Sequence, residues 1–355
     1  MFSEILPRMC DIDDSLHVTL LTSGKCLQAL PTHLCIHHHP LLPVDDLFRP
    51  RRLWLPILQR ARSRIQQSWV KNANGRIWHS TYYTMLEKWE GSVIVTVVDM
   101  IPEHFMHLFN GSGNDWFREQ KRRCVLAADA VICISRTTQK DVQQFYGIDA
   151  ARIQVVPLAH SPIFRLLDAT DHSFKLPTAK PFLLYVGSRA QYKNFRSLLY
   201  GYSVWPRRDE ADLVVVGSGW SREEKRTLAE LEIKERVLLL GNVDDESLCH
   251  LYNQASAFVY PSLYEGFGIP LLEAMACGCP VVASRIPATM EVAGECPIYF
   301  EPTETDDLLA ALDTVLLEGR DSRRVRLGLE QVKHFSWDET TRGTLDVYHA
   351  LSNSE

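Results

Sequence analysis

The chain has 355 residues, a hydrophobic content of 46% and a charged content of 23%, values that are typical of a soluble globular protein with two domains. A formal net charge of −6 argues against general binding of nucleic acid, and no apolar run is long enough to predict a transmembrane helix. The nine cysteines are an odd number without a CxxC motif, which favours free thiols. We therefore expect a cytoplasmic protein.

The first half of the chain alternates predicted strands with helical patterns. FSEILPRM (2–9) reads as a helix at the start. Short apolar, β-branched runs then predict strands at 17–22, 75–80, 92–98, 130–135 and 153–158. Three histidines at 37–39 precede a proline-rich stretch, and we interpret them as a solvent-exposed loop rather than as metal ligands.

The second half repeats this alternation after a linker. Residues 160–181 contain three prolines and no sustained periodicity, which indicates the connection between two domains. The strands predicted beyond it are 182–187, 213–217, 237–241, 257–262 and 280–284, and the helices include 221–232, 244–254 and 338–352. Apolar strands that alternate with helices predict an α/β fold with two doubly wound parallel sheets. We assign the domains to 1–165 and 175–334, followed by a C-terminal helical segment at 335–355.

A candidate anion site follows the first strand of the second domain. The strand ends at Gly187, and the next loop carries Arg189 and Lys193 just before a helix begins. Backbone amides, the helix dipole and two cations together favour phosphate, although two solvated surface cations are an alternative interpretation. Gly217 ends the following strand and permits a close approach of the backbone.

The stretch SLYEGFGIPLLEAMACGCPVVAS (262–284) places two acids eight positions apart, Glu265 and Glu273. Between them, Gly266 and Gly268 leave their amides unshielded, and Pro270 suits the first position of a helix. Carboxylates accept hydrogen bonds from vicinal hydroxyls such as those of ribose or sugars. We therefore expect one loop that offers an acid to each end of a ligand. A simple helix-start acid and a simple loop residue are the alternatives.

These residues resemble a known family. PSLYEGFGIPLLEAMACGCPVVAS is similar to the Glu-x7-Glu signature of retaining glycosyltransferases of family 4, which have the GT-B fold, and YVGSRAQYKNF resembles their diphosphate-binding loop. Further similarities lie at 238–262, 288–294 and 335–348. The likeness is to bacterial mannosyltransferases of O-antigen or exopolysaccharide synthesis. It implies two Rossmann-like domains facing across a cleft, with the last helix crossing back to the N-terminal domain.

The resemblance also implies roles for the donor-side residues. Arg189 and Lys193 would neutralise the diphosphate of a nucleotide sugar, Glu273 would hold its ribose, and Glu265 would face the transferred sugar. The amides nearest to that sugar belong to Phe267 and Gly268. Such enzymes need no metal or other cofactor, and they keep the anomeric configuration through attack on the same face. The resemblance implies GDP-mannose as the donor and a lipid-linked glycan as the acceptor.

The N-terminal half departs from the family pattern. Relatives begin with a strand and a glycine-rich turn, whereas residues 2–9 already read as the first helix, so we expect the first strand to be missing. Val98 stands where many relatives carry histidine near the attacking hydroxyl. We therefore consider Asp99 and His79 as catalytic residues on the acceptor side. A strand-terminating cap and a packed loop histidine are their respective alternatives.

A basic stretch and two other functions complete the predictions. Residues 49–69 combine arginines with tryptophan and aliphatic residues, a pattern typical of segments that lie on an anionic membrane, here the inner face of the plasma membrane. A solvated helix that packs on its own domain is the alternative. Besides a glycosyltransferase, we consider a catalytically impaired protein that binds sugar nucleotides and a non-hydrolysing UDP-sugar epimerase.

Overall fold

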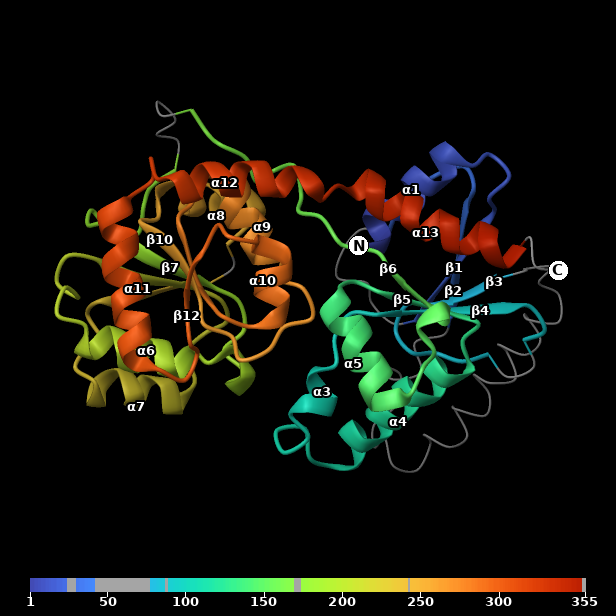
Figure 1. The fold of residues 1–355 in the computed structure, drawn as a ribbon, viewed down its shortest axis with the longest axis horizontal. Coiled ribbons are helices and arrows are strands. Elements are labelled where there is room, and N and C mark those ends of the chain that lie inside the picture. The colour runs from blue at the N-terminus through green and yellow to red at the C-terminus, as the bar shows by residue number, and fades with distance from the viewer. Residues whose placement is uncertain (24–29, 42–76, 87–88, 169–173, 242, 353–355) are drawn as a thin grey trace.

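A computed structural model describes residues 1–355 apart from 24–29, 42–76, 87–88, 169–173, 242 and 353–355. The chain forms two α/β halves joined by an extended segment and by the last helices (Figure 1). The basic stretch 49–69 lies outside the described residues. Among those described, none of the helices combines the length and the hydropathy that a membrane span needs.

The N-terminal half contains parallel strands. After helix α1 (Phe2–Ile12), strand β1 (Val18–Ser23) pairs with β2 (Ile36–Leu41). A second sheet has the order β3-β4-β5-β6. Its strands are β3 (Ile77–Ser80), β4 (Ser92–Val97), β5 (Ala130–Cys133) and β6 (Ile153–Val155), and helices α3 (Ile101–His104), α4 (Ser112–Ala127) and α5 (Arg136–Tyr146) connect them. The structure confirms each of the five predicted strands, some of them shorter than predicted.

The interpretation of 37–39 as a loop is wrong. The three histidines lie in β2, where His38 is in register with Leu20 of β1. Ile36 is buried at the start of the strand, while His37 and His38 remain exposed. Backbone pairing with β1 thus imposes the strand, and a run of polar side chains without apolar alternation gives no sequence signal for it.

The C-terminal half contains one parallel sheet of six strands in the order β12-β11-β10-β7-β8-β9. The strands are β7 (Phe182–Val186), β8 (Asp212–Val216), β9 (Val237–Leu240), β10 (Ala257–Tyr260), β11 (Val281–Ser284) and β12 (Ile298–Phe300). The five predicted strands are confirmed, and only the three-residue β12 is additional. The chain order reverses between β7 and β10, and ligands of such sheets bind at the carboxyl ends of the strands beside the reversal.

Helices cover both faces of this sheet (Figure 1). One face carries α6 (Phe195–Val204), α7 (Arg222–Glu230) and α11 (Thr305–Glu318), and the other carries α8 (Asp245–Gln254), α9 (Ile269–Ala276), α10 (Pro287–Ala293) and α12 (Arg323–Gln331). The strands are therefore buried on both sides, and all five residues of β8 are buried. This explains why they read as continuous apolar runs.

The last helix, α13 (Trp337–Ser352), returns to the N-terminal half and packs against α1 (Figure 1). The Thr340 hydroxyl donates to the carbonyl of Pro157 at 2.7 Å. Tyr348 is hydrogen-bonded to His79 of β3 at 2.7 Å. Ion pairs at 3.4 Å and 2.9 Å join Arg8 to Asp338 and Asp13 to His349. The chain therefore connects its two halves twice.

We predict that Tyr348→Phe lowers the free energy of unfolding by about 1–2 kcal/mol, because the substitution leaves a buried ring nitrogen of His79 without its partner. Urea unfolding measures the change. Tyr200→Phe is the matched control, since Tyr200 is 51% exposed, and we expect a change within about 0.5 kcal/mol. Equal stability of the two variants would contradict the proposed contribution of this contact.

Candidate active site

A buried ion pair joins the loops that follow β7 and β10, which are neighbouring strands. Lys193 ends the short helix η2 (Gln191–Lys193), and its Nζ lies 2.7 Å from Oε1 of Glu265. The Ser262 hydroxyl donates to the same oxygen at 2.6 Å. Glu265 is only 6% exposed, and buried carboxylates are usually paired in this way. The structure thus brings together two of the predicted donor-binding residues.

Arg189 does not join this pair. Its guanidinium pairs with Glu224 of α7 and donates to the carbonyls of Ser218 and Gly219 at 2.8 Å and 2.9 Å. The guanidinium also lies 4.7 Å from the centre of the Trp220 ring. Burial acts to raise the pKa of Glu224, but the hydrogen bonds from Arg189 and Ser221 outweigh it and lower that pKa. The charge of Arg189 is therefore paired with that of Glu224, and its guanidinium holds the loop after β8 in place. Its contact with a diphosphate stays a prediction.

Two of the predicted glycines shape the ends of β7 and β8. Gly187 has a φ of 132°, which favours glycine. A Cβ on Gly217 would lie 2.7 Å from the carbonyl oxygen of Gly187 and 3.0 Å from Nη1 of Arg189. The absence of side chains here lets the two strand ends and the Arg189 guanidinium pack closely.

A cavity of about 860 Å³ lies beside this loop, between α6, α7 and the start of α11. Arg189, Gly219, Glu223 and Thr305 are among the residues that line it, whereas Lys193, Glu265 and Glu273 are not. The hollow therefore adjoins the candidate site through Arg189 but does not contain its acids. We therefore locate the candidate site by its charged side chains and not by the volume of this cavity.

Glu273 occupies a separate, apolar position on α9. The Tyr252 hydroxyl donates to its Oε2 at 3.2 Å, and burial raises the pKa of Glu273 to about 7. Phe267, in the preceding loop, packs against the ring of Phe335 with 5.7 Å between centroids. Gly268 has a φ of 120° just before the helix begins. Glu265 and Glu273 thus have different partners, and their contacts with sugar and ribose stay predictions.

The two halves meet at Gly266. A Cβ on Gly266 would lie 2.0 Å from the carbonyl oxygen of Val98 and 3.0 Å from the Asp99 Cβ. The carbonyl of Gly266 accepts hydrogen bonds from the hydroxyls of Ser135 and Thr138, at 2.6 Å and 3.2 Å. Ser135 is also the N-cap of α5. The loop between the two acids is therefore the contact surface of the domains.

Asp99 lies at this contact. Its Oδ1 accepts a hydrogen bond from the amide of Ile101 at 3.0 Å, which agrees with the alternative interpretation of Asp99 as a strand-terminating cap. Its backbone carbonyl oxygen accepts a hydrogen bond from Lys121 at 2.6 Å. Burial raises the pKa of Asp99, although the nearby Lys121 opposes that shift. Lys121 in turn forms a buried ion pair with Glu103 at 2.9 Å. Asp99 is thus held beside the Glu265 loop, and a catalytic role for it stays a prediction.

His79 lies apart from this contact. Its two ring nitrogens are hydrogen-bonded to the Tyr348 and Thr96 hydroxyls, both at 2.7 Å, and burial lowers the pKa of His79 to about 3. The imidazole is therefore neutral near pH 7 and ties β3 to β4 and α13. The structure places His79 as a packed histidine of a strand rather than a loop, and gives it no contact with the Glu265 loop.

Two further contacts across the domains involve residues that the sequence did not single out. Glu291 of α10 accepts from the amides of Arg136 and Thr137 at 2.6 Å and 3.0 Å, at the start of α5. Tyr264 donates to Asp141 at 2.6 Å. Anionic side chains are stabilised at a helix N-terminus, which explains the first contact. Glu291 falls within the family-like stretch 288–294, which was the available signal.

Comparisons with known proteins agree with this arrangement. The family model described as glycosyl transferases group 1 matches residues 168–329, and that of glycosyltransferase family 4 matches residues 14–160. Together they span most of the chain. The chain belongs to this group of glycosyltransferases. The split between the two models falls within the linker predicted at 160–181.

Relatives and solved structures extend the comparison. The chain is 33% identical to O-antigen chain mannosyltransferase B of Escherichia coli over 236 residues, which are 63% of this chain and 61% of that protein. It is 29% identical to O-antigen chain mannosyltransferase RfbU of Salmonella typhimurium, over 62% of this chain and 60% of the relative. The alignments thus span less than two thirds of these relatives.

Two solved structures confirm the GT-B fold. Sucrose-phosphate synthase from Thermosynechococcus elongatus matches with a TM-score of 0.79 and 20% identity, over 99% of this chain and 92% of that one. WaaG, a glycosyltransferase involved in lipopolysaccharide biosynthesis, matches with a TM-score of 0.71 and 16% identity, over 98% and 94% of the respective chains.

We predict that Gly266→Ala prevents the domains from closing and lowers transferase activity by about 10²-fold, because the new methyl group would overlap the carbonyl of Val98. Small-angle X-ray scattering measures the separation of the domains. Gly219→Ala is the control, since a Cβ there meets nothing within 4 Å. Wild-type scattering and activity of Gly266→Ala would show that this contact is dispensable.

We predict that Glu273→Gln stabilises the protein at about pH 8 and not at about pH 4. Burial raises the folded-state pKa of Glu273 from 4.5 to about 7, so ionisation above pH 7 costs folding free energy that a neutral amide does not. The gain in thermal midpoint should shrink as the pH falls through 7 and vanish below 4.5. Glu223→Gln, at a side chain 82% exposed, should show no such trend. A gain that does not vary with pH would contradict a buried, titrating Glu273.

Proposed function

We propose that this chain is a retaining mannosyltransferase that moves mannose from GDP-mannose to a lipid-linked glycan. A hydroxyl of the acceptor attacks C1 of the sugar on the face that the diphosphate leaves. The bond from C1 to the acceptor oxygen forms as the bond to phosphate breaks, and the hydroxyl proton passes to a phosphate oxygen. No side chain acts as a covalent nucleophile in this reaction, and no metal or cofactor is required.

The observation that carries the proposal is the buried pair of Lys193 and Glu265 at the carboxyl ends of adjacent strands. When the donor binds, Lys193 turns from Glu265 towards the leaving diphosphate, where a cation stabilises the developing negative charge. Glu265 then accepts from hydroxyls of the transferred sugar. Asp99 lies next to Gly266 at the same contact, which supports a place for it on the acceptor side.

The relatives support the choice of sugar. Several of them are named as O-antigen or serotype-specific mannosyltransferases, among them WbdA of Escherichia coli at 27% identity. A glycan acceptor is therefore the natural substrate class to propose. A lipid carrier for that glycan agrees with the predicted membrane affinity of residues 49–69.

We predict that GDP-mannose raises the thermal midpoint of the full chain more than UDP- or ADP-sugars do, since a ligand that binds only the folded state stabilises it by mass action. Lys193→Ala should abolish this shift and the transfer of labelled mannose. Lys225→Ala, at an exposed lysine of α7, should retain both. An unchanged shift and unchanged transfer by Lys193→Ala would refute the proposed site.

The same experiment separates the impaired sugar-nucleotide-binding protein. The specific observation in its favour is Val98, which is 40% exposed at the domain contact and has no side-chain hydrogen-bonding group. A shift with GDP-mannose, but no transfer to lipid-linked acceptors and none after Val98→His, would support that alternative. Gain of transfer in Val98→His would instead identify the residue that the chain lacks.

A further inference from the structure

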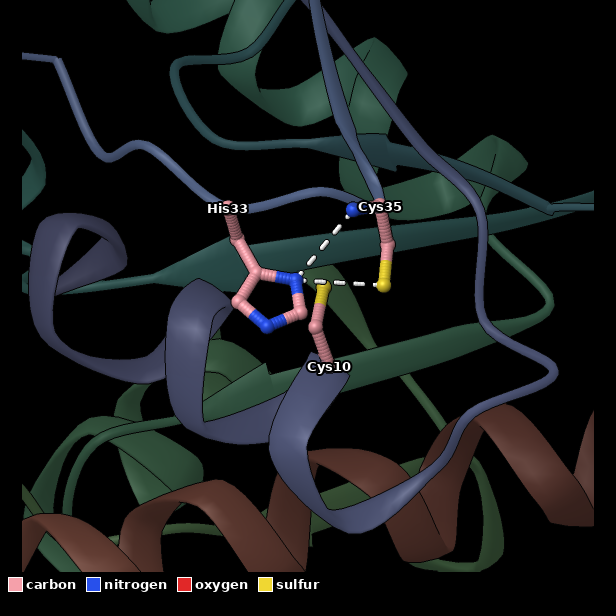
Figure 2. Close-up of side chains that lie close together, drawn as sticks. All are labelled: Cys10, His33 and Cys35. Atoms are coloured by element: carbon pink, nitrogen blue, oxygen red, sulfur yellow. Dashed lines mark hydrogen bonds between the residues drawn. The ribbon is translucent and has the colours of Figure 1, made fainter.

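Three potential metal ligands converge in the N-terminal half, remote from the candidate active site. Cys10 lies in the last turn of α1, and His33 and Cys35 immediately precede β2. Figure 2 shows the two thiols and the imidazole directed towards one another. The ligand atoms of the three side chains all lie within 4.8 Å of one another. In the part of the chain that the structure describes, no other group of three or more such residues meets this criterion.

The orientation of His33 suits a metal ligand. Its Nδ1 accepts a hydrogen bond from the amide of Cys35 at 3.2 Å and lies 3.1 Å from the Cys35 sulfur, so the lone pair of this nitrogen faces the cysteines. The proton then resides on Nε2, which lies 3.3 Å from a carboxylate oxygen of Asp11. A metal-bound histidine characteristically donates its other N–H to such a carboxylate, which fixes its tautomer.

The spacing of the ligands is close to that of a tetrahedral site. Zinc–sulfur and zinc–nitrogen bonds of about 2.3 Å and 2.0 Å place neighbouring ligand atoms roughly 3.5–3.8 Å apart. The sulfur of Cys35 and Nδ1 of His33 need to separate by only about 0.5 Å to reach that distance. Changes of this size require side-chain rotation and no refolding.

The ligand set selects the metal. Two thiolates and one imidazole form a soft site that favours Zn²⁺ over Mg²⁺ or Ca²⁺. Cys10 is 1% exposed, so its sulfur is shielded from solvent. A divalent cation supplies the positive charge that a thiolate needs in this position, and its binding releases the thiol protons.

We propose that Cys10, His33 and Cys35 bind one Zn²⁺ that fastens the end of α1 to the start of β2. Water or another ligand completes the fourth position. The ion is structural, because it joins two elements that also pack against each other. This site is independent of the proposed mannosyl transfer.

The test uses the full chain, purified under reducing conditions and dialysed against Zn²⁺ or Co²⁺. We expect one Zn²⁺ per chain, and for Co²⁺ the thiolate charge-transfer and intense visible bands of a tetrahedral site. A chelator should lower the thermal midpoint of the wild-type chain, and added Zn²⁺ should restore it. Cys35→Ser should weaken metal uptake by at least about tenfold, and Cys10→Ser combined with Cys35→Ser should abolish it.

Cys124→Ser is the matched control, because Cys124 is also 1% exposed but lies on α4 outside the cluster. It should bind metal as the wild-type chain does. If Cys10→Ser does not fold, Cys35→Ser provides the decisive comparison, since Cys35 is only half-buried. The proposal is overturned if the reduced wild-type chain takes up no Zn²⁺, if uptake persists unchanged in Cys35→Ser, or if a disulfide between Cys10 and Cys35 forms and its reduction restores no metal binding.

Discussion

A carboxylate that is buried at the carboxyl end of β10 fixes the arrangement of the cleft. Lys193 forms an ion pair with Glu265, and the Ser262 hydroxyl donates to the same carboxylate oxygen. Removal of one member of a buried ion pair is strongly destabilising. The pair holds the loop so that Gly266 presents its carbonyl to Ser135 and Thr138 of the other half. The ion pair between Lys193 and Glu265 therefore positions the loop that carries the candidate donor-binding residues and that also contacts the N-terminal half.

The two cations of the loop after β7 have separated roles. Lys193 pairs with Glu265, a carboxylate that can also accept hydrogen bonds from hydroxyl groups in place of the lysine. Arg189 instead forms an ion pair with Glu224 and donates hydrogen bonds to two backbone carbonyls, and so connects the loops that follow β7 and β8. The two positive charges of this loop therefore have different acidic partners, Glu265 and Glu224.

Much of the fold was predictable because its signals are local. Buried parallel strands such as β8 read as apolar runs, and the glycines and proline around Glu265 mark a strand-to-helix turn. β2 was missed because its histidines form a strand only through pairing with β1. The sequence placed Glu265 and Lys193 in one predicted site, and the structure brings these two side chains together. The pairing of Arg189 with Glu224 and the packing of His79 on Tyr348 depend on residues far along the chain, so no signal in the sequence pointed to them.

The packing of α1 beside α13 has a consequence for synthesis on the ribosome. Asp13 and His349 form an ion pair although 336 positions separate them, and His79 is hydrogen-bonded to Tyr348, which lies 269 positions further along the chain. The part of α1 that packs against α13 stays uncovered until this final helix has been translated. Non-local contacts form slowly, and exposed apolar surface promotes aggregation. We therefore expect chaperones to bind the first half of the chain during its synthesis.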